Sequence, residues 1–346
     1  MIISEKHHNI VYGKTFSKLK KNQIKELVNN YSKRFRVNKI DPKKIFKNKK
    51  CLDAGCGFGR GSLFMLSNSA KFVTSVDISD NNIKTTNQNL KNYGFKNFKT
   101  LKKNISNLPF KDESFDVVWC YGVIHHTKFT DRSLKELTRV LKTGGFLKLF
   151  VYGSGGIHWY IMNKFRKIFN NFDTNQIIEI LNFLNYTEID IVNFIDNWKT
   201  SYLRTYTAKD LNMRLSSLGF LKPKPHRYGL SYDTNQRKNN FLNDKKWMGE
   251  GDLRYLIKKI KDTKSENNKL SNSEKGSNYQ FENIISRNLD NKFNKIEKKL
   301  KNNIFLSVTI SAKIHKKLLE LLNSSKSFDA RNFIKYVDQI CKFLNK

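Results

Sequence analysis

The sequence predicts an α/β fold in which helices pack on both faces of a mostly parallel, doubly wound sheet. Three observations lead to this fold class. Between about residues 48 and 153, short apolar segments alternate with segments of helical spacing, as in strand-helix-strand crossover units. The first apolar segment, KCLDAG, ends in a glycine turn. The fourth, SFDVVWCYGV at 114–123, is continuously apolar, as is typical of a strand buried on both faces.

The strands and helices follow one another in a regular order along this stretch. Apolar segments predict strands at 50–55, 72–79, 97–105, 114–123 and 146–153. Helical spacing predicts helices at 16–36, 61–69, 80–95 and 131–145. Asp80 is the expected cap of the third helix and Gly94 its terminator, while Gly144 and Gly145 are expected to close the fourth. Residues 1–47 are therefore an N-terminal helical segment, and residues 48–153 form the core domain.

Composition limits the class of protein. Of the 346 residues, 38% are apolar and 13% aromatic, which argues against wholesale disorder. No run approaches the roughly 20 apolar residues that a membrane-spanning helix requires. The N-terminus, MIISEKHHNIVYGK, lacks the features of a secretory signal, so we expect a cytoplasmic protein. No group of cysteines, histidines or carboxylates suggests a metal, and the four cysteines show no paired ligand spacing: Cys51, Cys56, Cys120 and Cys341.

The formal charge of +35 admits two interpretations. It could mark a surface for nucleic acid or for an anionic membrane. However, only 13 of the 65 basic residues are arginine, and the lysines are spread along the whole chain. Arginine is the better bidentate phosphate reader, and a functional patch should be concentrated on one face. We therefore favour an AT-rich coding sequence as the origin of the charge, and nucleic acid is not the favoured partner.

Three glycines occupy alternate positions directly after the first predicted strand: Gly55, Gly57 and Gly59. An open parallel sheet binds ligands at the carboxyl ends of its strands, and glycine lets a ligand approach the backbone closely. A nicotinamide dinucleotide site would space its glycines as G-x-G-x-x-G, whereas the spacing here is G-x-G-x-G with Asp53 before it. The departure favours a loop that closes over an amino-acid moiety and a nucleoside.

Four segments in this order resemble the motifs of the class I S-adenosylmethionine-dependent methyltransferases, most closely the type-11 group that includes quinone-biosynthesis enzymes. They are LDAGCGFGRG, SVDIS, NLPFKDESFDVVWCYGVIHHT and RVLKTGGFLKLF, within about residues 50–152, with a weaker echo in YTAKDLNMRLSSLGF at 206–220. The resemblance implies a Rossmann-like, seven-stranded sheet that ends in an antiparallel hairpin. It also implies S-adenosylmethionine as the cofactor.

The resemblance assigns cofactor contacts to particular residues. The backbone around Gly55, Cys56, Gly57 and Gly59 would surround the methionine part, with Asp53 near its ammonium. Asp77 would accept both ribose hydroxyls, because a carboxylate offers two acceptor oxygens. The competing role for Asp77 is a helix cap, which Ser79 or Asp80 would fill better. The remaining cofactor candidates are Ile78, Asn104, Ile105, Cys120 and Tyr121.

Asn104 departs from the family pattern. The family often has GDA at the end of the third strand, where the aspartate holds the exocyclic amine of adenine, and this chain has KNI. The amide oxygen of Asn104 can still accept a hydrogen bond from that amine, and Ile105 can pack on the ring. A solvent-exposed Asn104 without a ligand role is the alternative.

The edge after the fourth strand carries two adjacent histidines, His125 and His126. In the family this edge faces the transferred methyl group. A neutral imidazole could remove a proton from the acceptor, so both histidines are candidate catalytic bases. A structural role in packing and hydrogen bonding below the loop is the competing interpretation. Methyltransferases that act on the amino group of adenine or glutamine carry an Asn/Asp-Pro-Pro-aromatic tetrad after the fourth strand. The corresponding segment here, CYGV, contains no proline, so methylation of these amino groups is disfavoured.

An insertion at 154–205 reads as aromatic-rich helices after a hinge at Gly153, Gly155 and Gly156. In the family such an insertion commonly forms a cap over the acceptor, although a helical pair that completes an ordinary core has the same pattern. The candidate acceptor contacts lie in DNWKTSYLRTY: Asp196, Trp198, Tyr202, Arg204 and Tyr206.

The rest of the chain is expected to complete the sheet and then add helices. Residues 206–260 should finish the core, with a strand and loop at 220–233 and a loop into a helix at 249–260. Residues 261–280 are a polar linker, because they are nearly free of apolar residues. Residues 281–346 are a basic helical appendage for docking, oligomerisation or peripheral membrane contact, with an inert helical layer as the alternative.

The sequence therefore predicts an enzyme that transfers a methyl group from S-adenosylmethionine, by direct displacement, to a small-molecule acceptor or biosynthetic intermediate. Two alternatives stay open. One is an RNA or other nucleic-acid methyltransferase that uses the basic surface as a substrate track. The other is a non-catalytic protein that binds the cofactor and interacts with a partner. The oligomeric state is not predicted.

Overall fold

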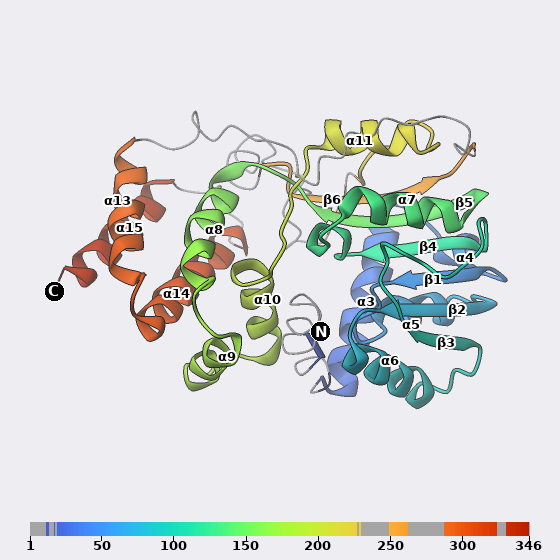
Figure 1. The fold of residues 1–346 in the computed structure, drawn as a ribbon, viewed down its shortest axis with the longest axis horizontal. Helices are drawn as coiled ribbons and strands as arrows, with labels where there is room; N and C mark the ends of the chain where they lie inside the picture. Colours follow the sequence, from blue (N-terminus) through green and yellow to red (C-terminus); the bar gives the residue numbers. More distant parts are fainter. Residues whose placement is uncertain are drawn as a thin grey trace. The chain divides into compact units, whose positions relative to one another are not determined.

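The computed structural model describes residues 12–13, 17, 19–226, 228–229, 249–261, 287–323 and 330–345. The chain divides into two compact units (Figure 1). The first comprises 1–153, 201–230 and 252–278, and the second comprises 154–200, 231–251 and 279–346. The predicted linker at 261–280 lies outside the described residues except for Lys261, and so does the end of the strand and loop predicted at 220–233.

The first unit is built on one sheet of six strands among its described residues. The strands are β1 (Lys50–Ala54), β2 (Phe72–Asp77), β3 (Phe98–Lys102), β4 (Phe115–Tyr121), β5 (Leu141–Tyr152) and β6 (Asp252–Lys258). Their order is β3-β2-β1-β4-β5-β6, with β6 antiparallel to β5 and the other pairs parallel. The α/β fold class with a mostly parallel, doubly wound sheet is confirmed.

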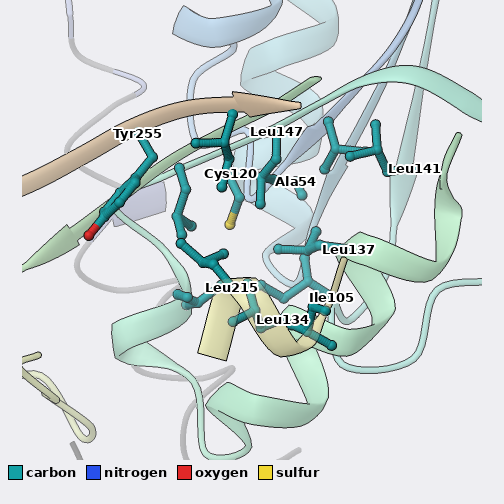
Figure 2. Packing of buried hydrophobic residues seen from close by; sticks show 14 of the residues in the cluster. Ala54, Ile105, Cys120, Leu134, Leu137, Leu141, Leu147, Leu215 and Tyr255 are labelled. Carbon is teal, nitrogen blue, oxygen red and sulfur yellow. The ribbon is translucent and has the colours of Figure 1, made fainter. Parts of the chain in front are cut away.

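Helices cover both faces of this sheet (Figure 1). The segments α3 (Lys21–Val37), α4 (Pro42–Phe46), α5 (Arg60–Ser67) and α6 (Asp80–Asn92) enclose one apolar cluster with Val73 and Trp119 of the strands. The segments α7 (Thr130–Val140) and α11 (Ala208–Ser217) enclose a second cluster on the opposite face. Figure 2 shows this second cluster, in which Leu134 of α7 and Leu215 of α11 lie near Cys120 of β4. The predicted N-terminal helix is thus α3, and it belongs to the core.

Two expected boundaries are wrong. The helix predicted at 131–145 ends at Val140, and the residues up to Gly145 belong to β5. Gly145 is required there because a Cβ would lie 2.7 Å from the backbone oxygen of Asp116, so the glycine allows β4 and β5 to approach each other. Asp80 does not cap α6 either, since the Ser79 side chain accepts a hydrogen bond from the Asn82 amide.

The expected loop and helix at 249–260 is instead strand β6. Leu253, Tyr255 and Ile257 alternate into the second apolar cluster, which is the period of a strand. All seven residues of β6 pair with β5, from Asp252 opposite Tyr152 to Lys258 opposite Phe146. No seventh strand occurs among the described residues; at the expected position there is a single antiparallel bridge between Phe220 and Lys259.

The second unit is helical in its described residues. It contains α8 (Gly156–Phe169), α9 (Thr174–Phe183), α10 (Glu188–Trp198), α13 (Arg287–Leu300), α14 (Ile304–Asn323) and α15 (Ala330–Leu344). Its core is aromatic, with Phe165, Phe169, Phe194 and Trp198 fully buried. The insertion at 154–200 and the C-terminal helices therefore share one core. None of the described helices is both long enough and apolar enough to cross a bilayer.

Candidate functional site

The glycine loop lies at the point where the order of the strands in the sheet reverses. Strand β1 pairs with β2 on one side and β4 on the other, so the loop after Ala54 sits at the topological switch point. Gly55, Gly57 and Gly59 have φ of +82°, +56° and +87° respectively, in the region that glycine favours. The amides of Gly55 and Cys56 both donate to the carbonyl of Val76, at 2.8 and 3.0 Å. The loop is therefore fixed to the end of β2.

Gly55 is the most constrained of the three glycines. A Cβ at this position would lie 2.5 Å from both Cγ atoms of Val123, in the segment that follows β4. The left-handed φ and this contact both select glycine. The loop thus passes directly over the carboxyl end of β4 without a side chain between them.

Asp77, the last residue of β2, connects this loop to the next helix. Its carboxylate accepts hydrogen bonds from the amides of Gly57 and Ser79, both at 2.9 Å, and from Asn82 Nδ2 at 3.2 Å. The side chain is buried, with 6% of its surface exposed. Ser79 caps α6, so the helix-cap role weighed for Asp77 is filled by another residue. The carboxylate instead holds the glycine loop beside the carboxyl end of β2.

A pocket of about 360 Å³ opens at the carboxyl ends of β2 and β3, where Ile78, the residue after Asp77, is part of its lining. Its lining is Ile78, Lys102, Lys103, Asn104, Asn107 and Pro109. Two predicted cofactor residues, Ile78 and Asn104, are therefore brought together. Asn104 is exposed, and its Oδ1 accepts hydrogen bonds from the amide and the hydroxyl of Ser106, both at 2.9 Å. Its Oδ1 is thus already engaged within the loop.

Asp53 lies beneath the loop rather than on its surface. The side chain is 2% exposed, and its Oδ2 accepts a hydrogen bond of 2.6 Å from Ser62 on α5. Ser62 is also 2.7 Å from the hydroxyl of Ser75 on β2. Burial, opposed by the Ser62 hydrogen bond and reinforced by the charge of Asp77, raises the pKa of Asp53 to about 7. The protonated form of this carboxyl is thus stabilised in the folded protein.

This raised pKa predicts a pH dependence of stability. An unfolded aspartate releases its proton near pH 3.8, whereas folded Asp53 has a pKa of about 7. The native state therefore binds more protons between these values, and Asp53 lowers the free energy of unfolding as pH rises from about 4 to 7. The total is at most about 4 kcal/mol. Chemical denaturation from pH 4 to 8 should show this fall in the wild type relative to Asp53→Asn. Parallel pH curves for the two proteins would contradict it.

Three other cofactor candidates have buried side chains. Cys56 is 5% exposed, and its sulfur accepts a hydrogen bond from the Thr86 hydroxyl at 3.4 Å. Ile105 and Cys120 point into the cluster between the sheet and α7 (Figure 2). Burial raises the pKa of both the Cys56 and the Cys120 thiol. None of these three residues lines the pocket at the sheet edge.

Tyr121 ends β4 on the opposite face of the sheet from Cys120. Its hydroxyl accepts a hydrogen bond of 2.7 Å from Arg254 Nε on β6. The ring packs edge-on against Tyr31 of α3, at 5.0 Å between centroids, and lies 4.8 Å from Phe150 of β5. Tyr121 is therefore part of an aromatic layer under α3, next to the glycine loop.

The two histidines form a short 3₁₀ helix, η2 (Ile124–His126), directly after β4. Both are buried, with their ring centroids 4.1 Å apart. His125 packs against Tyr152 at 4.3 Å. His126 Nδ1 lies 3.0 Å from the carbonyl oxygen of Tyr202. A carbonyl can only accept, so in the neutral imidazole the proton is on Nδ1 and the lone pair is on Nε2.

The segment from 201 to 206 forms hydrogen bonds with the residues around the histidine pair. The Arg204 amide donates to the carbonyl of His125 at 3.0 Å, and its guanidinium donates to the carbonyls of Thr127 and Lys128. Tyr206 is buried in the core, and its amide donates to the carbonyl of Tyr152 at 3.0 Å. Tyr202, Arg204 and Tyr206 are thus assembled with the histidine pair, as one cluster within the first unit.

The other two acceptor candidates, Asp196 and Trp198, belong to α10 in the second unit. Trp198 is fully buried, stacks on Phe194 at 5.4 Å and donates from Nε1 to His315 Nδ1 at 3.3 Å. The structure places it as a packing residue. Asp196 is half-buried on the same helix.

Several residues of the site were not predicted. Lys102, Lys103, Asn107 and Pro109 line the pocket, and Val123 fixes the glycine loop from below. The signal for the lysines was their place at the end of the third predicted strand, immediately before Asn104. Val123 had no signal, since its role depends on a contact with a residue 68 positions away in the sequence. No group of three or more potential metal ligands occurs among the described residues.

Comparisons with known proteins agree with this geometry. Residues 52–149 match the family described as "Methyltransferase domain". The chain is 34% identical over 109 residues to the sterol 4-C-methyltransferase strm-1 of Caenorhabditis elegans, covering 31% of this chain and 32% of that protein. It is 33% identical over 106 residues to squalene methyltransferase 1 of Botryococcus braunii, covering 30% and 28%. The chain thus spans about a third of the length of these relatives.

One of the solved structures that resemble part of the chain is also a methyltransferase. It is the 1,6-didemethyltoxoflavin-N1-methyltransferase of Burkholderia thailandensis, determined with bound 1,6-didemethyltoxoflavin and S-adenosylhomocysteine. The match has a TM-score of 0.39 and 15% sequence identity, and covers 62% of this chain and 72% of that one.

Proposed function

Since residues 52–149 form a class I methyltransferase domain of the type-11 group, whose cofactor is S-adenosylmethionine, we propose that this chain methylates a small-molecule acceptor. The observation that carries the proposal is the pairing of the glycine loop with Asp77 at the switch point of the sheet. The family match covers the part of the chain that builds this edge.

The residues at the edge fit the proposed cofactor. The carboxylate of Asp77 would accept the ribose hydroxyls, and the pocket lined by Ile78 and Asn104 would take the adenine. The left-handed glycines would let the amino-acid part approach the loop backbone without meeting a Cβ atom. Asp53 would support that part from below, through Ser62 and the first turn of α5, since it is buried.

The cofactor supplies a methyl group that is already activated on a sulfonium. The protein therefore has to bind the acceptor in line, exclude water and remove a proton where the acceptor has one. His126 suits the last task, because Tyr202 holds its Nδ1 proton and leaves Nε2 as the basic atom. The Arg204 bonds to Thr127 and Lys128 hold the segment that carries this ring.

The proposed acceptor class is a small organic molecule. The two relatives are named as methyltransferases of a sterol and of squalene, which are both small apolar molecules. The Tyr152 ring packs against His125, and such an edge favours an organic acceptor with an apolar body over a polyanion.

Replacing His126 with alanine should lower kcat about 100- to 10,000-fold if the acceptor is protonated. The base removed by this change acts in the reaction step, so KM should change little. Arg204→Lys is a companion variant that keeps a positive charge but loses the forked contact, and it should be affected less. Unchanged turnover in His126→Ala would remove this histidine from the mechanism.

Two measurements test the function as a whole. Calorimetry of the purified chain with S-adenosylhomocysteine should show one-to-one binding. Incubation of the chain and methyl-labelled cofactor with cell extract, followed by mass spectrometry, should yield a labelled small molecule. Label in the RNA fraction, with strong salt dependence, would instead identify a nucleic-acid methyltransferase. Cofactor binding without any labelled product would identify a non-catalytic protein.

A further inference from the structure

A pocket in the helical unit lies outside the site described above. It has a volume of about 350 Å³, and its lining residues come from α13 and α15 and the residue after α15. Its lining is Lys295, Ile296, Lys298, Lys299, Cys341, Leu344 and Asn345. Three of these seven residues are lysines and none is acidic, although both helices carry acidic residues elsewhere.

The contact between α13 and α15 changes character along its length. At one end, Lys292 forms an ion pair of 2.5 Å with Asp338. One turn further along α13 comes Lys295, and one further again Lys299, which continue the face of Lys292. The residues that follow Asp338 on this side are Cys341 on α15 and Asn345 just beyond its end, and neither carries a negative charge. Lys295 and Lys299 therefore face residues of the other helix that offer them no carboxylate.

The acidic residues of the two helices are placed away from this pocket. They are Asp290, Glu297 and Asp338, of which Asp290 pairs with Lys164 and Asp338 with Lys292. None of the three lines the pocket. Within the part of the chain that the structure describes, Lys295, Lys298 and Lys299 form no ion pair. Lysines in the last turn of a helix interact favourably with the helix dipole, which accounts for Lys298 and Lys299. The dipole does not account for Lys295, nor for the pocket that the three lysines line.

The floor of the pocket is apolar. Ile296 is 1% exposed, and Leu344 is half-buried beside it. A cationic rim over an apolar floor suits an anion that carries a hydrocarbon part. Like charges at spacings of three and four residues repel one another, and a bound anion would offset this repulsion.

We propose that the pocket between α13 and α15 is a binding site for a phosphate group, held by Lys295, Lys298 and Lys299. The phosphate would belong either to an anionic phospholipid headgroup, with its chain over Ile296 and Leu344, or to free inorganic phosphate. The site is separate from the methyl-transfer proposal, since every lining residue belongs to the helical unit.

Calorimetry of the full chain tests the site with three probes: dihexanoyl phosphatidylglycerol below its micelle concentration, zwitterionic dihexanoyl phosphatidylcholine, and inorganic phosphate. The wild type should bind the anionic lipid with one-to-one stoichiometry and the zwitterionic lipid at least about tenfold more weakly. The double variant Lys295→Gln/Lys299→Gln should weaken anion binding by roughly tenfold or more, since two of three charges are lost. Inorganic phosphate that binds as tightly as the lipid would identify free phosphate as the ligand.

The control removes the same charge from a neighbouring helix. Lys313 and Lys316 are exposed on α14 and do not line the pocket, so Lys313→Gln/Lys316→Gln should bind the anion within about twofold of the wild type. Circular dichroism would verify that both double variants are folded. Equal losses in the two double variants, or failure of the wild type to bind either anion, would overturn the site. Binding of S-adenosylhomocysteine is read separately and is expected to be equal in all three proteins.

Discussion

Replacing Asp77 with alanine should abolish detectable binding of S-adenosylhomocysteine. The substitution removes the carboxylate that we propose accepts hydrogen bonds from the ribose hydroxyls. Charge-assisted hydrogen bonds of this kind contribute about 1.5–3 kcal/mol each. The substitution would also release the amides of Gly57 and Ser79, which the side chain holds at 2.9 Å. The glycine loop then loses its link to the end of β2. We expect a weakening of at least about a hundredfold in calorimetric titrations.

Asp80 provides the matched control for this experiment. It is also a carboxylate, three residues further along the chain, but it is 55% exposed and pairs with Lys102 on the surface at 2.6 Å. An exposed pair of this kind contributes little, so Asp80→Ala should bind S-adenosylhomocysteine within about threefold of the wild type. Thermal unfolding of Asp77→Ala would distinguish lost binding from lost structure. Retained affinity in a folded Asp77→Ala protein would contradict the assignment of the ribose site.

Replacing Gly55 with alanine should both destabilise the protein and prevent cofactor binding. The alanine would have to keep φ near +82°, which costs about 1–2 kcal/mol. Its Cβ would also lie 2.5 Å from the Val123 side chain, so the loop or the start of η2 has to move. Overpacking of this kind adds about 1–3 kcal/mol. Chemical denaturation should therefore show a loss of about 2–5 kcal/mol.

Gly94 separates the two causes of this loss. It has almost the same φ, +81°, but a Cβ there would meet no atom within 4 Å. Gly94→Ala should consequently lose only about 1–2 kcal/mol and keep its affinity for S-adenosylhomocysteine. If the two variants are equally stable, the contact with Val123 is not a constraint on the loop.

Most of the sheet could be predicted from the sequence because the strands of the core are marked by local patterns. Strands β1, β2 and β4 are short, mostly apolar runs, and the helices that follow β1 and β2 indicate that β1, β2 and β3 are parallel. The sequence of β6 is ambiguous, because Leu253, Leu256 and Ile260 also fit the spacing of a helix. What makes the segment a strand is its pairing with β5, more than 100 residues earlier, and no local pattern records that partner.

The site shows the same division between local and distant information. The glycines and Asp77 occur in an ordered motif, so their place at the sheet edge could be predicted. Motif order does not give the direction of each side chain, and Cys120 and Ile105 point into the apolar core. Trp198 was grouped with Tyr202 and Arg204 by sequence proximity, although the boundary between the two units falls between them.

The pairing of β5 with β6 also has a consequence for how the protein is made. Residues 146–152 leave the ribosome about 100 residues before their partners at 252–258. At translation rates of about 5–20 residues per second, the edge of β5 that pairs with β6 stays unpaired for roughly 5–20 seconds, until β6 has been synthesised. During that interval its unpaired amides and carbonyls are open to association with other nascent chains. We expect folding yield to depend on chaperones that shield this edge until synthesis passes β6.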